Sequence, residues 1–373
     1  MKSSLFTRFM GVIATLLVVC SCRHRPLVDM GNTHYVRVYV QPDIQNVTYG
    51  FYDPTLPKPR FRLPNVMRFM LCDPQTGHVV GERYLQNVGR DEKGYYVDGY
   101  VIAPAGSYRV MCYNFGTEAT QIRHENNYYK VEAYTNRVSD MIATQFPQSK
   151  AEFEGQPILY DPDHLFVAQE ELIEIRPTPN IDTLYAAKGG YFEARTLVKS
   201  YYIQLRIKGV QWVQSSVSLL SGMSPSVWVH NRELNEYDPS ILFFELKAGH
   251  RSDRIYPQTN AENDFANENG IPNPNADANE PQTATLYTTF NTFGKLPNES
   301  SIFRITFEFV RIDGKSQTET MDITPLFRSK EALEHQWLLI DREIVIEKPE
   351  PEGGGGFEPG VDEWDDEHID IIL

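Results

Sequence analysis

The chain has 373 residues, more than a single hydrophobic core usually organises, so its length predicts two domains. Its formal net charge of −15 at pH 7 argues against nucleic acid as a partner and against a polybasic grip on anionic lipid. Aromatic residues make up 12% of the chain, and together with 24 Gly and 24 Pro they favour strands and turns over helices.

The first residues have the pattern of an export signal. Two cations, Lys2 and Arg8, precede an apolar run that extends from Phe9 to Val19. That run is too short to remain in a bilayer as a spanning helix, and no second long apolar run follows. We therefore predict a signal peptide over residues 1–21 and no membrane span after its removal.

The end of the apolar run resembles a bacterial lipobox, because an aliphatic residue and two small residues precede Cys22. In a lipobox the final cysteine is diacylated and becomes the first residue of the mature chain, so Cys22 is the predicted lipidation site and residues 22–33 a lipidated tether. Each buried methylene of the acyl chains contributes about 0.8 kcal/mol to membrane attachment. Cys20 is the weaker candidate because bulky Val19 precedes it. The alternative is a plain secretory signal with two incidental cysteines.

Two further cysteines, Cys72 and Cys112, lie in predicted strands of the first half. Export makes a disulfide between them chemically allowed. The alternative is a pair of buried thiols that act as small hydrophobic side chains. The sequence does not show whether the two Cα atoms come within bonding range, so both readings stay open.

The first half reads as an antiparallel β-sandwich over residues 34–192. Residues 34–41 alternate as a half-buried strand does, with Val36, Val38 and Val40 against Tyr35, Arg37 and Tyr39. A Pro-rich loop follows, which contains Arg60 and Arg62. Further strands are predicted at residues 66–72, 78–85, 95–102, 107–114, 128–134 and 172–176.

Turn signals connect these strands. Residues 73–77 predict a hairpin between the second and third strands, and residues 104–106 join the next two strands as a pair. One helical turn is predicted near residues 138–146.

The second half reads as another β-sandwich over residues 193–348. Its strands are predicted at residues 201–207, 217–221, 241–246, 302–312 and 337–346. Asp313-Gly314-Lys315 is a hairpin signal. Residues 256–281 are rich in Asn, Asp, Glu and Pro, which predicts a long exposed loop.

The composition changes again over residues 349–373. A Pro-Glu repeat and the glycines 353–356 predict a flexible hinge, and an acidic segment follows it. Ile369, Ile371 and Leu373 would share one side of an extended strand. Such a strand can pair within its own domain or with the open edge of a neighbour, where it would act as a donor strand.

Familiar catalytic and metal motifs are missing from the sequence. It contains no dinucleotide-binding or phosphate-binding glycine loop, no His-Glu-x-x-His and no Gly-x-Ser-x-Gly. The nine His are scattered without the spacing of a zinc site. We therefore predict no catalytic residues, no metal and no cofactor.

Two weaker binding signals have ordinary explanations. Residues 273–280 are rich in side-chain oxygens, as in a calcium loop, but the glycine that forms the sharp turn of such a loop is missing. Four tryptophans could stack sugars, although aromatic residues in strands are more often part of the core: Trp212, Trp228, Trp337 and Trp364.

The order of short motifs along the chain resembles the fimbrillin-associated anchor lipoproteins of Bacteroidetes and their uncharacterised relatives. The motifs lie at residues 22–27, 104–108, 113–114, 220–223, 289–294 and 321–324, and the Gly run with its acidic, Trp-containing ending completes the series. The resemblance implies two tandem transthyretin-like β-sandwiches and a role in surface filaments.

The resemblance also implies a mechanism. In that family, stalk subunits lose their first strand to an Arg-directed protease, and another subunit's strand fills the groove. An anchor keeps its lipid and its first strand. We therefore expect an outer-membrane lipoprotein at the cell surface that anchors or regulates fimbria-like filaments by strand exchange with other fimbrillin-like subunits.

Two alternatives stay open. The residues after Cys22 are basic, unlike the acidic cluster that resembles a surface-export signal in this phylum, which leaves a periplasm-facing position open. The second expected function is glycan binding by a surface lipoprotein. An enzyme has little support because no catalytic constellation is present.

Overall fold

The computed structural model describes residues 31–41, 63–114, 117–139, 146, 155–248, 279–296, 302–335 and 337–350. Several predicted features therefore lie outside the described residues. They are the signal peptide, Cys22, the Pro-rich loop, nearly all of the 138–146 turn and the 256–281 loop, and the hinged tail with Ile369, Ile371 and Leu373.

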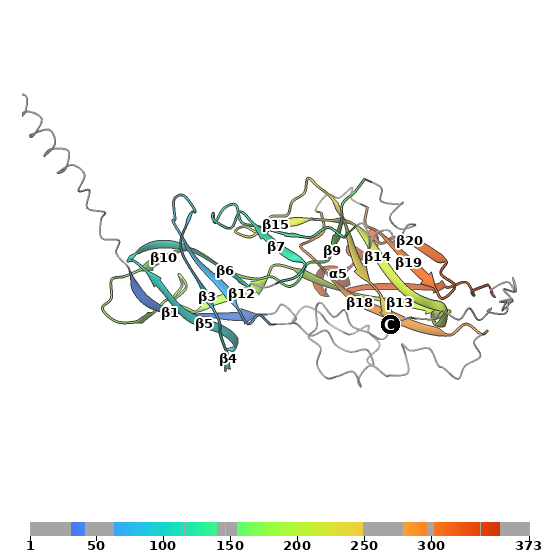
Figure 1. Cartoon of the computed structure of the whole chain (residues 1–373), viewed down its shortest axis with the longest axis horizontal. Coiled ribbons are helices and arrows are strands. Elements are labelled where there is room, and N and C mark those ends of the chain that lie inside the picture. Colours follow the sequence, from blue (N-terminus) through green and yellow to red (C-terminus); the bar gives the residue numbers. More distant parts are fainter. Residues whose placement is uncertain are drawn as a thin grey trace, which may run out of the picture.

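The first part of the chain forms one large sheet (Figure 1). Its strands are β1 (Asn32–Gln41), β2 (Met67–Cys72), β3 (Val79–Leu85), β4 (Asn87–Asp91), β5 (Gly94–Ala103), β6 (Gly106–Asn114), β10 (Phe166–Ile175), β11 (Asp182–Thr183) and β12 (Phe192–Thr196). The order is β3-β2-β6-β10-β12-β1-β5-β4, with β11 beside β1. Only Gln86 separates β3 from β4, the two ends of this path, and β3 also contacts β5. The described strands therefore form a nearly closed ring.

A hydrophobic core fills the ring. The predicted alternation of β1 is confirmed, because Val36, Val38 and Val40 are at most 2% exposed and belong to this core. Tyr35 and Arg37 lie on the outer side and are only partly buried. β1 is thus held on its inner face by apolar burial, which stabilises it by removing methyl groups from water.

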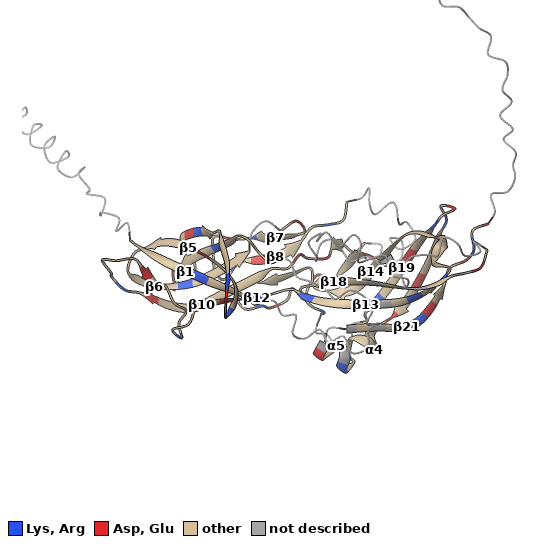
Figure 2. Ribbon diagram, turned by 90° about the horizontal axis from the view of Figure 1, so that it is seen from below, with Lys and Arg blue, Asp and Glu red and all other residues tan. Residues whose placement is uncertain are grey.

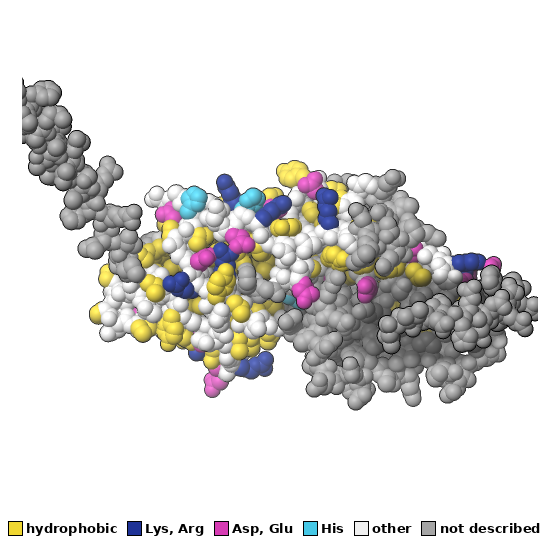
Figure 3. All heavy atoms as spheres, viewed as in Figure 1, with side chains coloured by type: hydrophobic (Ala, Val, Ile, Leu, Met, Phe, Trp, Pro, Cys, Tyr) yellow, Lys and Arg dark blue, Asp and Glu magenta, His cyan; other side chains and the backbone are white. Residues whose placement is uncertain are grey.

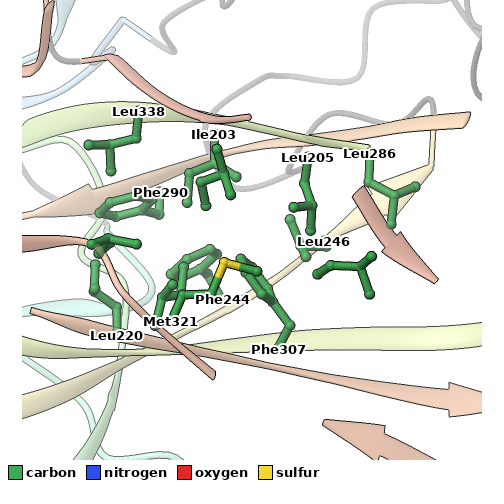
Figure 4. Close-up of a cluster of buried hydrophobic side chains, with 14 of the residues drawn as sticks. Ile203, Leu205, Leu220, Phe244, Leu246, Leu286, Phe290, Phe307, Met321 and Leu338 are labelled. Carbon is green, nitrogen blue, oxygen red and sulfur yellow. The ribbon is translucent and has the colours of Figure 1, made fainter. Parts of the chain in front are cut away.

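The second part is a two-layer β-sandwich. One layer has the order β17 (Lys247–Ala248), β18 (Thr283–Thr292), β13 (Lys199–Lys208), β21 (Trp337–Val345). The other has the order β20 (Ser316–Asp322), β19 (Arg304–Arg311), β14 (Val213–Met223), β16 (Ser240–Glu245), β9 (Ile158–Tyr160). Figure 4 shows Ile203 and Phe290 of the first layer packed toward Leu220 and Phe307 of the second. Three short helices complete this part: η2 (Val210–Trp212), α4 (Thr324–Phe327) and α5 (Lys330–His335).

Strands also pair across the predicted boundary at residues 192/193. A small sheet joins β7 (Thr120–Arg123) and β8 (Glu132–Thr135) to β15 (Ser226–Trp228), and β9 pairs with β16. A separate hydrophobic cluster at this junction contains residues from both parts, among them Met111, Val198 and Phe293. The two parts are therefore interlocked by strands as well as by the chain connection.

The structure corrects several sequence predictions. β5 and β6 follow each other but are not neighbours in the sheet, so residues 104–106 connect two distant strands rather than a hairpin pair. Neither part is wholly antiparallel, because β1–β12, β13–β21 and β9–β16 are parallel pairs. β18, a central strand, was not predicted, and residues 128–131 precede β8 rather than belong to it. The 73–77 hairpin is confirmed by the β2–β3 pairing.

The suggested disulfide between Cys72 and Cys112 is absent, and both residues are free, buried thiols. Cys112 lies opposite Phe69 in the register of β2 and β6, whereas Cys72 lies opposite Arg109. Residues 69 and 72 are an odd number of positions apart, so the two thiols point to opposite faces of the sheet. Cys112 packs in the core of the ring and Cys72 in the cluster at the junction.

Candidate functional site

The described residues contain no cluster of potential metal ligands. Within these ranges, no group of three or more His, Cys, Asp and Glu side chains could hold a metal ion. The same part of the chain has no helix long and apolar enough to cross a membrane. Trp212 is 6% exposed and belongs to the core of the second part, so it is not placed to stack a sugar. The structural features that bear on function are the first strand, the junction and the two ends of the molecule.

β1 lies between two partners in the large sheet. It is antiparallel to β5 from the pair Asn32–Ala103 to the pair Tyr39–Tyr96, and parallel to β12 from Val38 to Gln41. Its removal would expose the hydrophobic core along a slot between β5 and β12.

The outer face of β1 is bonded to its neighbours through Arg37. The guanidinium lies 3.0 Å from the Asp91 carboxylate of β4 and 3.5 Å from the Asp98 carboxylate of β5. It also donates a hydrogen bond to the Tyr35 hydroxyl, which in turn donates one of 2.5 Å to Asp98. One side chain of β1 therefore links three strands, in charge-assisted contacts stronger than neutral ones.

Tyrosine rings surround this network. The Arg37 guanidinium lies 3.9 Å from the centre of the Tyr96 ring, within cation–π range. Tyr39 packs edge-on against Tyr96 and against Tyr191, which directly precedes β12. Gly89 leaves the space for Tyr96, because a Cβ at that position would lie 2.4 Å from the ring.

The pKa values of the tyrosines reflect this environment. Burial first, and then the hydrogen bond to Asp98, raise the pKa of Tyr35 to about 12. Burial and the hydrogen bond to Asp91 raise the pKa of Tyr39 in the same way. The Tyr39 hydrogen bond, in turn, lowers the pKa of Asp91. Asp91 therefore stays charged, and the Tyr35 and Tyr39 phenols stay neutral, at neutral pH.

The chain reaches β1 through a tightly packed glycine. Gly31 has φ of 70°, and a Cβ on it would lie 2.3 Å from the carbonyl carbon of Ala103. An L side chain at this position would be strained by conformation and by contact. The backbone conformation is therefore fixed at Gly31, near the end of the predicted tether of residues 22–33.

A buried polar network joins the two parts of the molecule. The Asn114 amide donates to the His164 carbonyl at 3.0 Å and accepts from the Phe166 backbone. Asn291 of β18 donates to the Pro162 carbonyl, and the Ser200 hydroxyl donates to Asn291. Burial lowers the pKa of His164 to about 3, so its ring is neutral. Buried hydrogen bonds of this kind favour one arrangement of the elements they join.

The last described residues pack against the β19–β20 hairpin. The Gln317 side chain donates to the Val345 carbonyl and accepts from the Glu347 backbone N–H. Lys315 forms an ion pair of 2.7 Å with Glu350, the final described residue. The chain therefore reaches residue 350 beside this hairpin.

The two ends of the described chain lie far apart. Figure 1 shows an elongated molecule with β1 in the part at the left and β19 and β20 at the right. In the turned view of Figure 2, α4 and α5 lie beside β21. β20 and β21 are the outermost strands of their sheets among the described residues. The predicted tether and the predicted hinge thus connect to opposite ends.

The predicted site residues divide into three groups. Cys22, Ile369, Ile371 and Leu373 lie outside the described residues, and Cys72 and Cys112 are core thiols. The Arg37 network was not predicted as a unit. Its signal was the Tyr-x-Arg-x-Tyr pattern on the outer face of a half-buried strand, but the carboxylates come from β4 and β5 and have no fixed spacing from it.

Comparisons with known proteins find similarity to proteins named as fimbrial. Residues 81–244 match a family model described as a domain of unknown function, DUF5119. Over 95% of both chains, the sequence is 22% identical to a Bacteroides ovatus protein named "Putative fimbrium anchoring subunit Fim4B". The predicted resemblance to fimbrial anchor-like proteins is confirmed by this match.

Two solved structures are similar to the chain. A crystal structure of a "putative adhesin" from Bacteroides ovatus has a TM-score of 0.50 and 18% identity, covering 88% of this chain and 98% of its own. The fimbrial anchor protein Mfa2 from Porphyromonas gingivalis has a TM-score of 0.42 and 10% identity, covering 84% of this chain and 91% of its own. The all-β fold is therefore shared with a solved adhesin-class structure.

Proposed function

We propose that this protein is a non-enzymatic anchor of fimbria-like surface filaments. A lipid on Cys22 attaches it to the outer membrane, and its hinged tail engages a neighbouring filament subunit. The two parts of the molecule correspond to two tandem transthyretin-like sandwiches. The named function of the Bacteroides ovatus relative, a fimbrium anchoring subunit, supports this proposal over the whole chain.

The observation that carries the proposal is the placement of the two attachment segments. The tether leads directly into β1, and the hinge begins beside the β19–β20 hairpin at the other end. Mechanical load passes between these two segments through three sets of contacts. They are the Arg37 network, the strand pairs across the boundary and the buried polar junction. An anchor needs this polarity, whereas a soluble binding protein does not.

The environment of β1 supports its retention as a built-in strand. Val36, Val38 and Val40 are buried on one face, and Arg37 is fixed by two carboxylates on the other. A shaft-like subunit would have to lose this strand to open its groove. An anchor keeps it, and presents only its own tail strand, with Ile369, Ile371 and Leu373 as the side chains that set the register.

Lipid attachment is tested by labelling with a radioactive or alkyne-bearing fatty acid in a Bacteroidetes host. The full chain is compared with Cys22→Ala and, as the matched control, Cys20→Ala. We expect label and membrane fractionation in the full chain and in Cys20→Ala, and loss of both in Cys22→Ala. Label retained by Cys22→Ala, or none in the full chain, would overturn the lipid-anchored part of the proposal. Protease shaving of intact cells then distinguishes the cell surface from the periplasmic face.

The alternative of glycan binding has less support. It was predicted from tryptophans and from the Asn-rich loop, nearly all of which lies outside the described residues. Trp212 lies in the core of the second part, and Trp228 is partly buried. The tyrosine hydroxyls on the face of β1, at Tyr35 and Tyr39, are engaged by carboxylates of the protein itself. Binding of polysaccharides by the purified chain would restore this alternative.

A further inference from the structure

Among the described residues, the segments that gather where β1 begins carry no charged side chain. Three segments form it: residues 31–33, 99–108 and 177–181. They meet there because Asn32 pairs with Ala103, Ile175 pairs with Gly106, and residue 181 directly precedes the Asp182–His34 pair. We name these residues the uncharged tip. In a chain with 23% charged residues, eighteen neutral positions gathered at one end are a marked local departure.

The uncharged tip exposes large apolar side chains. Tyr100 is 55% exposed, Ile102 48% and Ile181 65%. Pro104 and Ala105 in the turn between β5 and β6 are exposed as well. Figure 3 shows hydrophobic side chains on the surface at this end of the molecule. The ion pair of Glu174 with Arg176, and Asp182, border the tip.

The length of chain before the structure limits what this tip can meet. Nine residues lie between Cys22 and Asn32, and an extended chain spans at most about 3.6 Å per residue, so the ten steps from Cys22 to Asn32 span roughly 35 Å. If Cys22 is held in a bilayer, the tip is the part of the described protein that must stay closest to it. This step rests on the proposed lipid attachment.

We propose that the uncharged tip docks on the surface of a zwitterionic phospholipid bilayer. Exposed isoleucines enter the boundary between headgroups and acyl chains, and Tyr100 sits at the headgroup level, where tyrosine is favoured. Among the tip residues there is no lysine or arginine, so the contact does not select anionic lipid. Docking sets the direction of the molecule, with the β19–β20 end pointing away from the membrane.

The test recreates the tether chemically. The chain from residue 22 is coupled through the Cys22 thiol to a maleimide-bearing lipid in vesicles of phosphatidylcholine and phosphatidylethanolamine. Cys72 and Cys112 are buried and do not compete. Hydroxyl-radical footprinting then measures modification of Tyr100 against Tyr237, which is 87% exposed in the second part.

On vesicles we expect modification of Tyr100 to fall about threefold or more, with Tyr237 unchanged. A variant with Ile102→Asp and Ile181→Asp should restore modification of Tyr100. The matched control is Ile302→Asp with Ile312→Asp, which alters two isoleucines that are 57% and 59% exposed elsewhere, and it should leave the protection in place.

Three results would overturn docking on lipid. They are equal modification of Tyr100 with and without vesicles, protection that survives in the tip variant, and protection that appears in solution without vesicles, which would indicate a protein partner or a second copy. Because the coupling uses thiol chemistry, none of these outcomes depends on whether cells lipidate Cys22. Failure of docking and failure of the lipid-anchor proposal are therefore distinguishable.

Discussion

Arg37 of β1 lies over the ring of Tyr96 of β5, with its guanidinium carbon 3.9 Å from the ring centre. Its nitrogens reach Asp91 and Asp98 at the same time. The first strand is thus attached to two other strands by one side chain, at the point where the proposed load from the membrane enters the fold.

Replacement of Arg37 by methionine should destabilise the protein by about 1–3 kcal/mol, because it leaves the partly buried Asp98 carboxylate and the more exposed Asp91 carboxylate without their cation. Urea unfolding measures the change. Arg195→Met is the matched control, since its ion pair with Glu193 is exposed and 3.4 Å long, and it should change stability by less than about 0.5 kcal/mol. Equal effects of the two substitutions would show that the network does not hold β1.

Gly31→Ala should destabilise the start of β1 by about 1–3 kcal/mol, because the positive φ and the contact with the Ala103 carbonyl both oppose a Cβ. Gly190→Ala tests the general effect of a methyl group, since no atom lies within 4 Å of its Cβ position. Hydrogen exchange of residues 32–36 reports the local loosening. Exchange that is unchanged in Gly31→Ala would contradict the tight packing described here.

Stability should fall as the pH drops from about 6.5 toward 3. Burial lowers the pKa of His164 to about 3, whereas an unfolded histidine titrates near 6.5. In this window the unfolded chain binds a proton that the folded chain excludes, so protonation favours unfolding, by at most about 1.4 kcal/mol per pH unit. His164→Gln should flatten this part of the pH profile, while His78→Gln, at an exposed position, should not. If stability falls with pH at the same slope in both variants, His164 is not the cause of the loss.

Neither core cysteine should react with a thiol reagent in the folded protein. Burial raises the pKa of Cys72 to about 12 and also raises the pKa of Cys112, so both thiols stay protonated and out of reach. Mass spectrometry should detect no alkylation at either position under native conditions and alkylation at both in denaturant without a reductant. A requirement for a reductant would mean that the two thiols are bridged.

Local patterns were enough to predict much of the strand content. The alternation of residues 34–41 gave both the strand and its buried face, and Asp73 forms the turn that its position suggested, with its carboxylate accepting from the Gln75 and Thr76 backbone. Such features are determined by residues that are adjacent in the sequence, so a single sequence is enough to predict them.

Pairing partners could not be predicted in the same way. The turn at residues 104–106 looks like a hairpin, but it carries the chain between β5 and β6, which have different neighbours. β18 was obscured by its threonines, although Leu286 and Phe290, four positions apart, lie on one face of the strand and both are buried. The Arg37 network needs carboxylates from two other strands, so only the folded sheet brings it together.

The role of the tail is the central claim, and outer-membrane complexes test it most directly. The intact protein and a version ending at Gly356 are expressed in the native host, and membranes are run unheated and heated on denaturing gels. We expect heat-labile, detergent-resistant complexes with the intact protein and their loss on truncation, with the truncated chain still folded. Monomers alone in both samples would contradict strand exchange through the tail, and unfolding of the second part on truncation would show that the tail is its own last strand.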